Sequence, residues 1–452
     1  MTSSEQVVFR MRPKENKNIV PSINMAENNE GADKQLLDAL KDLRVGENRV
    51  HDYKHNINVF RWTLNKVILM THVNIFLYST CFWIQSGTLP YLTKRLGVNS
   101  VWYGYLQTVF AIGQLAGGPL FGRFGDLFGG RAAMNLAFVS SALSYLLLSM
   151  SSSVTLLFLS RVPALFMHAM QGGQMIVTDL GDVGKRADAL GKLGISYLIG
   201  MVLGPMIGGQ ITKHFSEETA AFVACMGSVL SIVLVLLFVP HRTKKVEVAD
   251  KSGSALLDLS KWKELILAPG ALFLLSLKMA TGTPIGIFQS MFQVIALETF
   301  NLPADQNGFL MAYIGVLTMV VQGVGVGVLL RKVSENAILK WASFLMVWSY
   351  LLLAFVGSIP QLCMVLAPLT VGLASSNIVI NSALTRTVSE IDTGSMLGLN
   401  MASNSLIRTV SPTIGGYMLQ AFGFPSFGYL GFLLSLIVTI ILFKIKVLTV
   451  LV

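Results

Sequence analysis

Residues 204–209 read Gly-Pro-Met-Ile-Gly-Gly, and residues 411–416 read Ser-Pro-Thr-Ile-Gly-Gly. A Leu-Gly pair precedes each copy at the same distance, at 190–191 and again at 397–398. Both copies lie inside long apolar segments, so the chain contains an internal duplication of membrane-type sequence. In transporters built from such repeats, the substrate binds at the interface between the repeats. The duplication therefore predicts two homologous membrane bundles with a site between them.

The composition of the chain also indicates a membrane protein. Hydrophobic residues make up 53% of the 452 residues, the mean hydropathy is +0.63 and only 13% of residues are charged, against roughly a quarter in soluble globular domains. The three cysteines all lie in apolar segments, where they can build neither a disulfide framework nor a zinc cluster. We therefore expect no metal site and no cofactor.

Apolar runs of about 20 residues, the length that crosses a bilayer, recur from Val67 onward with short polar breaks. Counting them gives twelve predicted spans. The resulting domain organisation is a largely disordered tail, a six-helix bundle, a linker of mixed charge, a second six-helix bundle and a short end, over 1–65, 66–240, 241–264, 265–445 and 446–452. The expected fold class is thus an all-α membrane protein with twelve transmembrane helices.

Lys and Arg gather in the loops on one side of the predicted spans, the side that also holds both termini. Loops that face the cytosol carry the excess of basic residues, so both termini are predicted to be cytosolic. Basic loops beside an anionic leaflet also account for most of the net charge of +10. The expected partner is therefore the lipid bilayer, of the plasma membrane or of an intracellular membrane, and not nucleic acid.

The loop after the second span carries a pattern of glycines and charges. Residues 122–131 read Gly-Arg-Phe-Gly-Asp-Leu-Phe-Gly-Gly-Arg, with Asp126 between basic residues at the membrane face. A carboxylate there can bind an Arg or a helix N-terminus and release it when the bundles move. We therefore predict a cytosolic gate, and the alternative is a tight loop whose charges only follow the orientation rule. Its candidate residues are Gly122, Asp126, Gly129, Arg131 and, at the end of the fourth span, Asp179.

This loop resembles the Gly-x-x-x-Asp-(Arg/Lys)-x-Gly-(Arg/Lys)-(Arg/Lys) signature of the major facilitator superfamily, although Leu127 and Gly130 replace two basic positions. The fifth span matches that family's antiporter motif, Gly-x-x-x-Gly-Pro-x-x-Gly-Gly, at every fixed position. Glycines four apart let another helix approach, and the proline bends the span. The motif predicts a hinge, and the alternative is ordinary close packing. Its residues are Gly200, Gly204, Pro205, Gly208 and Gly209.

Further stretches at 103–107, 117–123, 392–398 and 406–412 resemble the organic-cation-transporter-like branch of solute carrier family 22, a relative of the tetracycline and multidrug antiporters. The resemblance covers roughly residues 65 to 445. It implies two pseudo-symmetric bundles, alternating access and proton-linked export of organic cations. It also implies that no reaction is catalysed, in agreement with the absence of phosphate-loop, nucleophile-elbow and paired-carboxylate motifs.

Three basic residues lie inside predicted spans, where an ionisable group costs about 2.5 to 3.5 kcal/mol. Arg161 lies in span four, Lys278 in span seven and Arg408 in span eleven. Helical spacing adds polar neighbours on the same faces. Interhelical hydrogen bonding is the alternative interpretation of these polar neighbours. The candidate substrate- or proton-binding residues are Arg161, His168, Gln171, Lys278, Arg408, Asn404, Asn400, Asn381, Asn377 and His72.

The sequence places every carboxylate in the tail, in a loop or at a span end. A carrier of cations normally needs an anionic group at its site, whereas buried cations favour an anionic or zwitterionic substrate. Charge and resemblance therefore disagree about the substrate. Histidines 72 and 168 are candidate proton carriers because their ordinary pKa lies near 6.5.

The expected function is secondary active transport of small organic ions, organic cations or drugs by resemblance, with protons as the coupling ion. Two alternatives remain open. One is a carrier of anionic or zwitterionic solutes, and the other is a transporter fold kept as a receptor or scaffold. We expect the protein to work as a monomer.

Overall fold

The computed structural model describes residues 56–59, 62–180, 186–241, 259–389 and 392–444. The helices all belong to the unit of the chain that begins at Ile57. Most of the predicted tail, most of the predicted linker and the predicted C-terminal end lie outside the described residues. The last part of the tail forms a short two-stranded sheet, and the first span begins directly after it at Lys66.

The first half of the chain contains this sheet and the helices of the N-terminal bundle. Their bounds are β1 (Asn56–Val59), β2 (Trp62–Asn65), α2 (Lys66–Arg95), α3 (Ser100–Phe128), α4 (Gly130–Ser149), α5 (Val154–Leu159), η1 (Val162–Phe166), α6 (Ala169–Leu180), α7 (Arg186–His214) and α8 (Glu217–Phe238).

The second half begins with a short helix, α9, and continues with the C-terminal bundle. The bounds are α9 (Leu259–Leu267), α10 (Ala271–Glu298), α11 (Ala304–Val320), η3 (Val321–Gly325), α12 (Val326–Lys332), α13 (Glu335–Leu353), α14 (Ile359–Thr385), α15 (Thr393–Phe422) and α16 (Pro425–Lys444).

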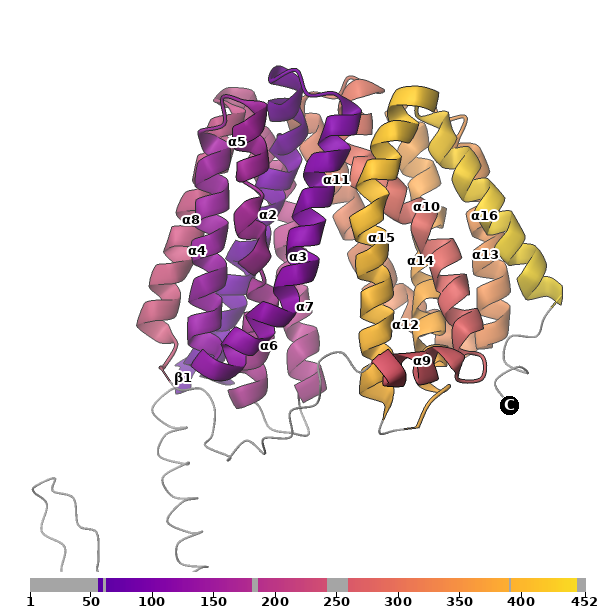
Figure 1. Cartoon of the computed structure of the whole chain (residues 1–452), viewed down its shortest axis with the longest axis horizontal. Coiled ribbons are helices and arrows are strands. Elements are labelled where there is room, and N and C mark those ends of the chain that lie inside the picture. The colour runs from indigo at the N-terminus through magenta and orange to yellow at the C-terminus, as the bar shows by residue number, and fades with distance from the viewer. Residues whose placement is uncertain (1–55, 60–61, 181–185, 242–258, 390–391, 445–452) are drawn as a thin grey trace, which may run out of the picture. The chain divides into compact units, whose positions relative to one another are not determined.

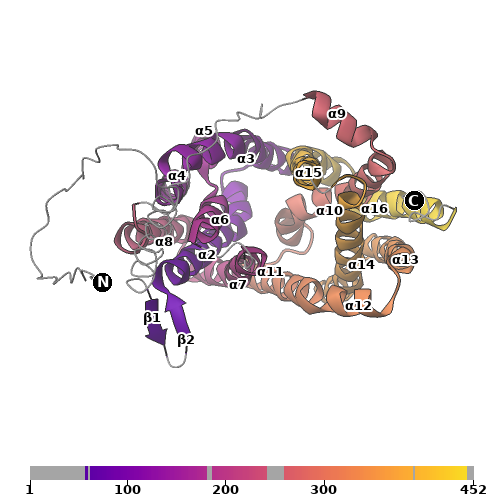
Figure 2. The ribbon, with the colours of Figure 1, turned by 90° about the horizontal axis from the view of Figure 1, so that it is seen from below.

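Most helices pack mainly on helices of their own half, whereas α11 packs mainly on α7 of the other half. In the N-terminal bundle α2 packs on α7 and α8, and in the C-terminal bundle α13 packs on α14 and α16. The most extensive contacts between the bundles join α7 with α11 and α3 with α15, as Figures 1 and 2 show from two directions. We call the end where α2 and α10 begin the linker end, and the opposite end the far end.

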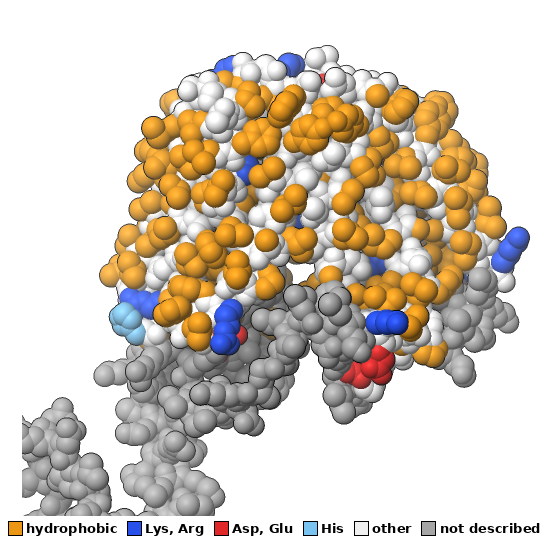
Figure 3. All heavy atoms as spheres, in the orientation of Figure 1, with side chains coloured by type: hydrophobic (Ala, Val, Ile, Leu, Met, Phe, Trp, Pro, Cys, Tyr) orange, Lys and Arg blue, Asp and Glu red, His pale blue; other side chains and the backbone are white. Residues whose placement is uncertain are grey.

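Ten helical segments of the described chain are long and apolar enough to cross a membrane. Helices α3 and α15 are 29 and 30 residues long but are not among those ten. Both carry polar side chains toward each other at the junction of the bundles, which lowers their hydropathy. With them the structure is consistent with the twelve predicted spans. Apolar side chains cover the face seen in Figure 3, as expected for a surface in lipid.

Local sequence explains where several helices begin and end. The Asn65 side chain accepts a hydrogen bond from Val67 N at 2.9 Å, and Asn99 accepts one from Trp102 N at 3.0 Å. Such caps satisfy amide groups that have no partner within the helix. Gly129, with φ of 86°, and Gly423, with φ of 71°, end α3 and α15 in a conformation that disfavours other residues.

The fourth span is broken, which the apolar pattern does not predict. Helix α5 ends at Leu159 and is followed by the 3-10 segment η1, with Pro163 at its start, before α6 begins at Ala169. Because proline lacks an amide hydrogen and clashes with the preceding turn, it interrupts an α-helix. The break leaves Arg161 between two helical pieces.

Candidate functional site

The two copies of the repeat make equivalent crossings between the bundles at the far end. A Cβ atom built at Gly308 in α11 would lie 2.4 Å from the carbonyl oxygen of Pro205. One built at Gly104 in α3 would lie 2.3 Å from the carbonyl oxygen of Pro412. Only glycine fits such close backbone contacts without a shift. The duplication in the sequence therefore corresponds to a duplicated helix crossing.

Hydrogen bonds also join the bundles at the far end. Lys213 Nζ donates to Asp305 Oδ2 at 2.7 Å, joining α7 to α11. Ser100 Oγ donates to Glu298 Oε2 at 2.7 Å, joining α3 to α10. No sequence signal pairs these residues, because their partners lie in the other half of the chain.

At the linker end, the described residues of the same helices make no such contacts. Cβ atoms built at Gly191 and Gly194 in α7, and at Gly394 and Gly398 in α15, would meet no atom within 4 Å. Figure 3 shows the surface notched between the bundles on this side. The repeat thus packs tightly at its Pro-x-Ile-Gly-Gly end and faces open space at its Leu-Gly end.

Most of the predicted hinge glycines face the interior of their own bundle. Cβ atoms at Gly200, Gly204 and Gly208 would lie 2.7, 2.7 and 2.9 Å from carbonyl oxygens of α2. Their spacing of four residues puts them on one face of α7. Pro205 and Gly209 each follow one of these glycines in the sequence, and both contact α11. The hinge motif therefore divides between packing within a bundle and packing between bundles.

The predicted gate residues lie near the linker end of α3, α4 and α6. Arg131 Nη2 donates to the carbonyl oxygen of Leu236 at 2.7 Å, near the end of α8. Gly122 lies beside Gln171, whose Nε2 would be 3.4 Å from a Cβ there. Asp126 is exposed and Asp179 is half-buried. Gly129 has the positive φ described above.

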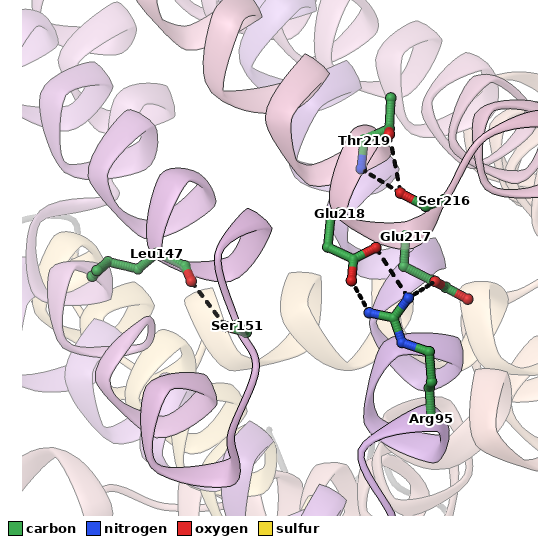
Figure 4. A network of polar contacts seen from close by, with 7 residues as sticks. All are labelled: Arg95, Leu147, Ser151, Ser216, Glu217, Glu218 and Thr219. Carbon is green, nitrogen blue, oxygen red and sulfur yellow. Dashed lines mark hydrogen bonds and ion pairs between the residues drawn. The ribbon is translucent and has the colours of Figure 1, made fainter.

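Arg95 ties two helices of the N-terminal bundle together at the far end. Its guanidinium binds Glu217 Oε2 at 3.0 Å and also pairs with Glu218 (Figure 4). Ser216 caps the same helix start by accepting from Thr219 N at 3.1 Å. This network fixes α8 against the end of α2, and these partners all belong to the described part of the N-terminal bundle.

Lys278 lies in the C-terminal bundle, with 4% of its surface exposed. Its ammonium group donates to Asn381 Oδ1 at 2.8 Å, to Asn377 Oδ1 at 3.5 Å and to Asn400 Oδ1. We call these three residues the amide cage. The sequence predicts polar residues on one face of each of two helices. In the structure these residues meet at Lys278 of α10, since α14 and α15 both supply amides to it.

Arg161 lies in the N-terminal bundle and is 2% exposed. Its Cζ atom lies 5.9 Å from the centre of the Phe110 ring, within the range of a cation–π interaction. Nε and Nη2 have no hydrogen-bond partner among the described residues, and neither has the hydroxyl of neighbouring Tyr145. Aromatic side chains therefore surround Arg161 in the interior of the N-terminal bundle.

Arg408 lies midway along α15 and is exposed. Its Nη2 donates to Gln114 Oε1 of α3 at 3.3 Å, and it acts electrostatically on Tyr78, His168 and Tyr197. All four neighbours belong to the N-terminal bundle. An exposed side chain with such neighbours lies between the bundles and does not point into lipid. Asn404, one turn earlier, is also exposed.

The remaining candidates lie in the N-terminal bundle. His72 Nδ1 is 2.9 Å from Ser196 Oγ, which joins α2 to α7. The His168 ring lies 5.5 Å from that of Phe121, and its Nε2 has no partner among the described residues. His168 and Gln171 both face α3, as Arg161 does, although η1 interrupts the helix between them. The three predicted cations do not meet at one point. Arg161 is buried in the N-terminal bundle, Lys278 is buried in the C-terminal bundle and Arg408 lies between the bundles.

Comparison with known proteins agrees with this architecture. Residues 71–390 match the Major Facilitator Superfamily. The chain is 38% identical over 385 residues to solute carrier family 22 member 18 of Rattus norvegicus, and the match covers 84% of this chain and 93% of the relative. The chain belongs to the major facilitator superfamily. It is therefore a membrane transporter of the solute carrier type and not an enzyme.

Two further matches at lower sequence identity agree with this assignment. Tetracycline resistance protein, class H, of Pasteurella multocida is 22% identical over 327 residues, covering 70% of this chain and 79% of that protein. The crystal structure of the nucleoside transporter NupG superposes with a TM-score of 0.67 at 14% identity, over 85% of this chain and 98% of that one. At 14% identity, the match to NupG supports the fold of this chain and nothing further.

Proposed function

We propose that this major facilitator protein carries small organic anions or zwitterions by alternating access, and that Arg408 attracts the substrate. The observation that supports this proposal is the position of Arg408, exposed midway along α15 and surrounded by residues of the other bundle. A permanent positive charge in a passage of low dielectric constant attracts an anionic group and disfavours a cation.

The distribution of carboxylates supports the same charge preference. The described acidic side chains lie at or near the ends of helices, away from the depth of Arg408. They are Asp126, Asp179, Glu217, Glu218, Glu264, Glu298, Asp305, Glu335 and Asp392. A carrier that binds an organic cation at mid-depth would gain from a carboxylate there, and the described part of this chain supplies none.

Proton-linked export of organic cations is the second candidate. It is favoured by the similarity to a tetracycline resistance protein and by the complete antiporter motif at 200–209. Under this candidate, aromatic and amide groups bind the substrate, and a histidine such as His72 or His168 exchanges with a proton. A receptor or scaffold role is the third candidate, and it predicts no flux of any solute.

The linker end fits the cytosolic side in this proposal. The basic loops of the chain meet at that end, and the orientation rule assigns such loops to the cytosol. In this proposal, the free space next to Gly191 and Gly398 belongs to a passage that opens toward the cytosol. Both termini would be cytosolic, and we propose that one copy of the chain is the transporting unit.

The test is uptake into proteoliposomes that contain the purified protein. Carboxyfluorescein serves as the organic anion and rhodamine 6G as the organic cation. We expect Arg408→Gln to lower carboxyfluorescein uptake about 10- to 100-fold, since a hydrogen bond to a charged group contributes about 1.5 to 3 kcal/mol. Arg386→Gln is the matched control, because Arg386 is exposed at the end of α14 and pairs with Glu335.

Each outcome separates the candidates. Uptake of rhodamine 6G that is driven by a pH gradient and is unaffected by Arg408→Gln would favour the cation antiporter. Uptake of neither dye by folded wild-type protein would contradict both carriers of charged solutes at once.

A further inference from the structure

The ammonium group of Lys278 has one hydrogen-bond acceptor for each of its three protons. The acceptors are the side-chain oxygens of Asn377 and Asn381 on α14 and of Asn400 on α15. Convergence of three neutral amides on one buried lysine requires three helices to be in register. The arrangement is therefore a built site for an ammonium ion, which the chain itself supplies.

Among the residues that the structure describes, no carboxylate pairs with this ammonium group. Helix α14 has no charged residue, and the single charged residue of α15 is Arg408, two turns beyond Asn400. The described charged or titratable groups on the other elements that pack against α10 form no ion pair with Lys278. With described side chains these include Lys263 and Glu264 of α9, Lys444 of α16, Asp305 of α11, His72, Lys94 and Arg95 of α2, and Arg123 and Asp126 of α3.

Amides can hold both protonation states of a lysine, which a carboxylate cannot. The ammonium form donates three hydrogen bonds to three amide oxygens. The neutral amine donates two and has a lone pair, and one asparagine that turns its side chain by 180° can donate an N–H to that lone pair. A carboxylate would instead hold the proton on the lysine through a salt bridge. The amide cage is thus suited to a lysine that gains and loses its proton.

The cage is closed on one side and open on the other. Asn400 is 6% exposed, Asn381 is half-buried and Asn377 is exposed. Asn377 therefore connects the ammonium group to an exposed surface of α14, and proton exchange requires that water reach this surface and accept a proton. A buried titratable group that reaches water through an exposed neighbour can exchange its proton with that water.

We propose that Lys278 is the proton-coupling residue of this carrier. The proposal rests on the proposed function, because coupling has a meaning only in a protein that transports. In the ammonium form, Lys278 adds a positive charge inside the C-terminal bundle and favours the anionic substrate through the interior of low dielectric constant. One N–H bond then breaks, the electron pair stays on nitrogen, the proton passes to water and the substrate loses that attraction. An anion and a proton therefore move in the same direction.

The first experiment separates coupling from binding in proteoliposomes. Counterflow of carboxyfluorescein at equal pH needs no proton movement, whereas accumulation against a gradient does. We expect Lys278→Gln to lower accumulation driven by a pH gradient about tenfold or more. The fold-decrease in counterflow should be several times smaller than the fold-decrease in accumulation. Lys332→Gln is the matched control, because Lys332 is exposed at the end of α12. Equal losses in both assays, or pH-driven accumulation equal to that of wild type, would overturn the proposal.

A second measurement needs no substrate and keeps the two proposals distinguishable. A rapid pH jump applied to proteoliposomes on a solid-supported membrane produces a transient current when a buried group of the carrier binds protons. We expect this current in wild type and in Lys332→Gln, and at most half of it in Lys278→Gln. A current that persists in Lys278→Gln but disappears in His72→Gln would overturn the proposal, even if dye uptake supports the anion carrier. Failure of dye uptake together with loss of the current in Lys278→Gln would contradict only the proposed substrate.

Discussion

Lys278 and Arg161 are both cations buried within a helix bundle, with 4% and 2% of their surfaces exposed, but their surroundings differ. Lys278 donates to three amide oxygens from two helices. Arg161 has Phe110 beside its guanidinium, and its Nε and Nη2 have no hydrogen-bond partner among the described residues. Burial alone therefore does not show whether a charged side chain in a membrane bundle has hydrogen-bond partners.

The difference determines what each charge contributes to stability. Removing one member of a hydrogen-bonded group leaves its partners buried and unpaired, at about 1 to 3 kcal/mol for each group. Replacing a buried charge that lacks partners by an apolar residue removes a desolvation cost and is often neutral or stabilising. A neutral variant of Lys278 should therefore lower the free energy of unfolding, whereas a neutral variant of Arg161 should leave it nearly unchanged or raise it.

The largest effect is expected for Lys278→Met. The substitution keeps a long unbranched side chain but leaves the oxygens of the amide cage without a donor. We expect the free energy of unfolding to fall by about 3 kcal/mol, measured by denaturant unfolding of the purified protein in detergent. A variant as stable as wild type would show that the amides are satisfied without the ammonium group, and the comparison with Arg161 would fail.

The next largest effect is expected within the cage itself. Asn400 is buried and Asn377 is exposed, so their replacement by leucine should not cost the same. We expect Asn400→Leu to lower the free energy of unfolding by about 2 kcal/mol and Asn377→Leu by less than about 1 kcal/mol, since water can replace an exposed partner. Equal losses in the same unfolding assay would contradict the inference that the cage opens at Asn377.

A smaller effect of opposite sign is expected for Arg161→Met. We expect the free energy of unfolding to stay within about 1 kcal/mol of wild type or to rise, because the guanidinium has few bonds to lose. Tyr145→Phe is the companion variant, since its hydroxyl also has no partner among the described residues. A loss of several kcal/mol in Arg161→Met would indicate a bound acceptor, such as an ordered water or an anion, that supports the guanidinium.

The fold follows from features that a single sequence displays. Apolar runs mark the spans, and the repeat at 204–209 and 411–416 marks the equivalent helices of the two halves. The break in span four was not predicted, although Pro163 is a signal for it. The division of the hinge motif, with Gly204 facing α2 and Gly209 facing α11, depends on which helices lie on either side of α7. Sequence spacing gives the faces of a helix but not its neighbours.

The candidate site was predictable residue by residue but not as an arrangement. The cost of a charge in lipid singles out Arg161, Lys278 and Arg408, and the spacing of four residues singles out the asparagines. The sequence does not show that Asn377, Asn381 and Asn400 meet at Lys278, because the contacts span about a hundred residues of chain. It also does not show that, of the three cations within spans, Arg408 is the one that contacts the other bundle. Both facts depend on the packing of helices that are distant in sequence.

The charge preference of the passage is tested most directly by reversing the charge at Arg408. The measurement is the ratio of the initial uptake rates of carboxyfluorescein and rhodamine 6G in proteoliposomes, for wild type and for Arg408→Glu. We predict that wild type prefers the anion and that Arg408→Glu prefers the cation, because the sign of the charge between the bundles has changed. A wild-type preference for rhodamine 6G that Arg408→Glu leaves unaltered would contradict the proposed function.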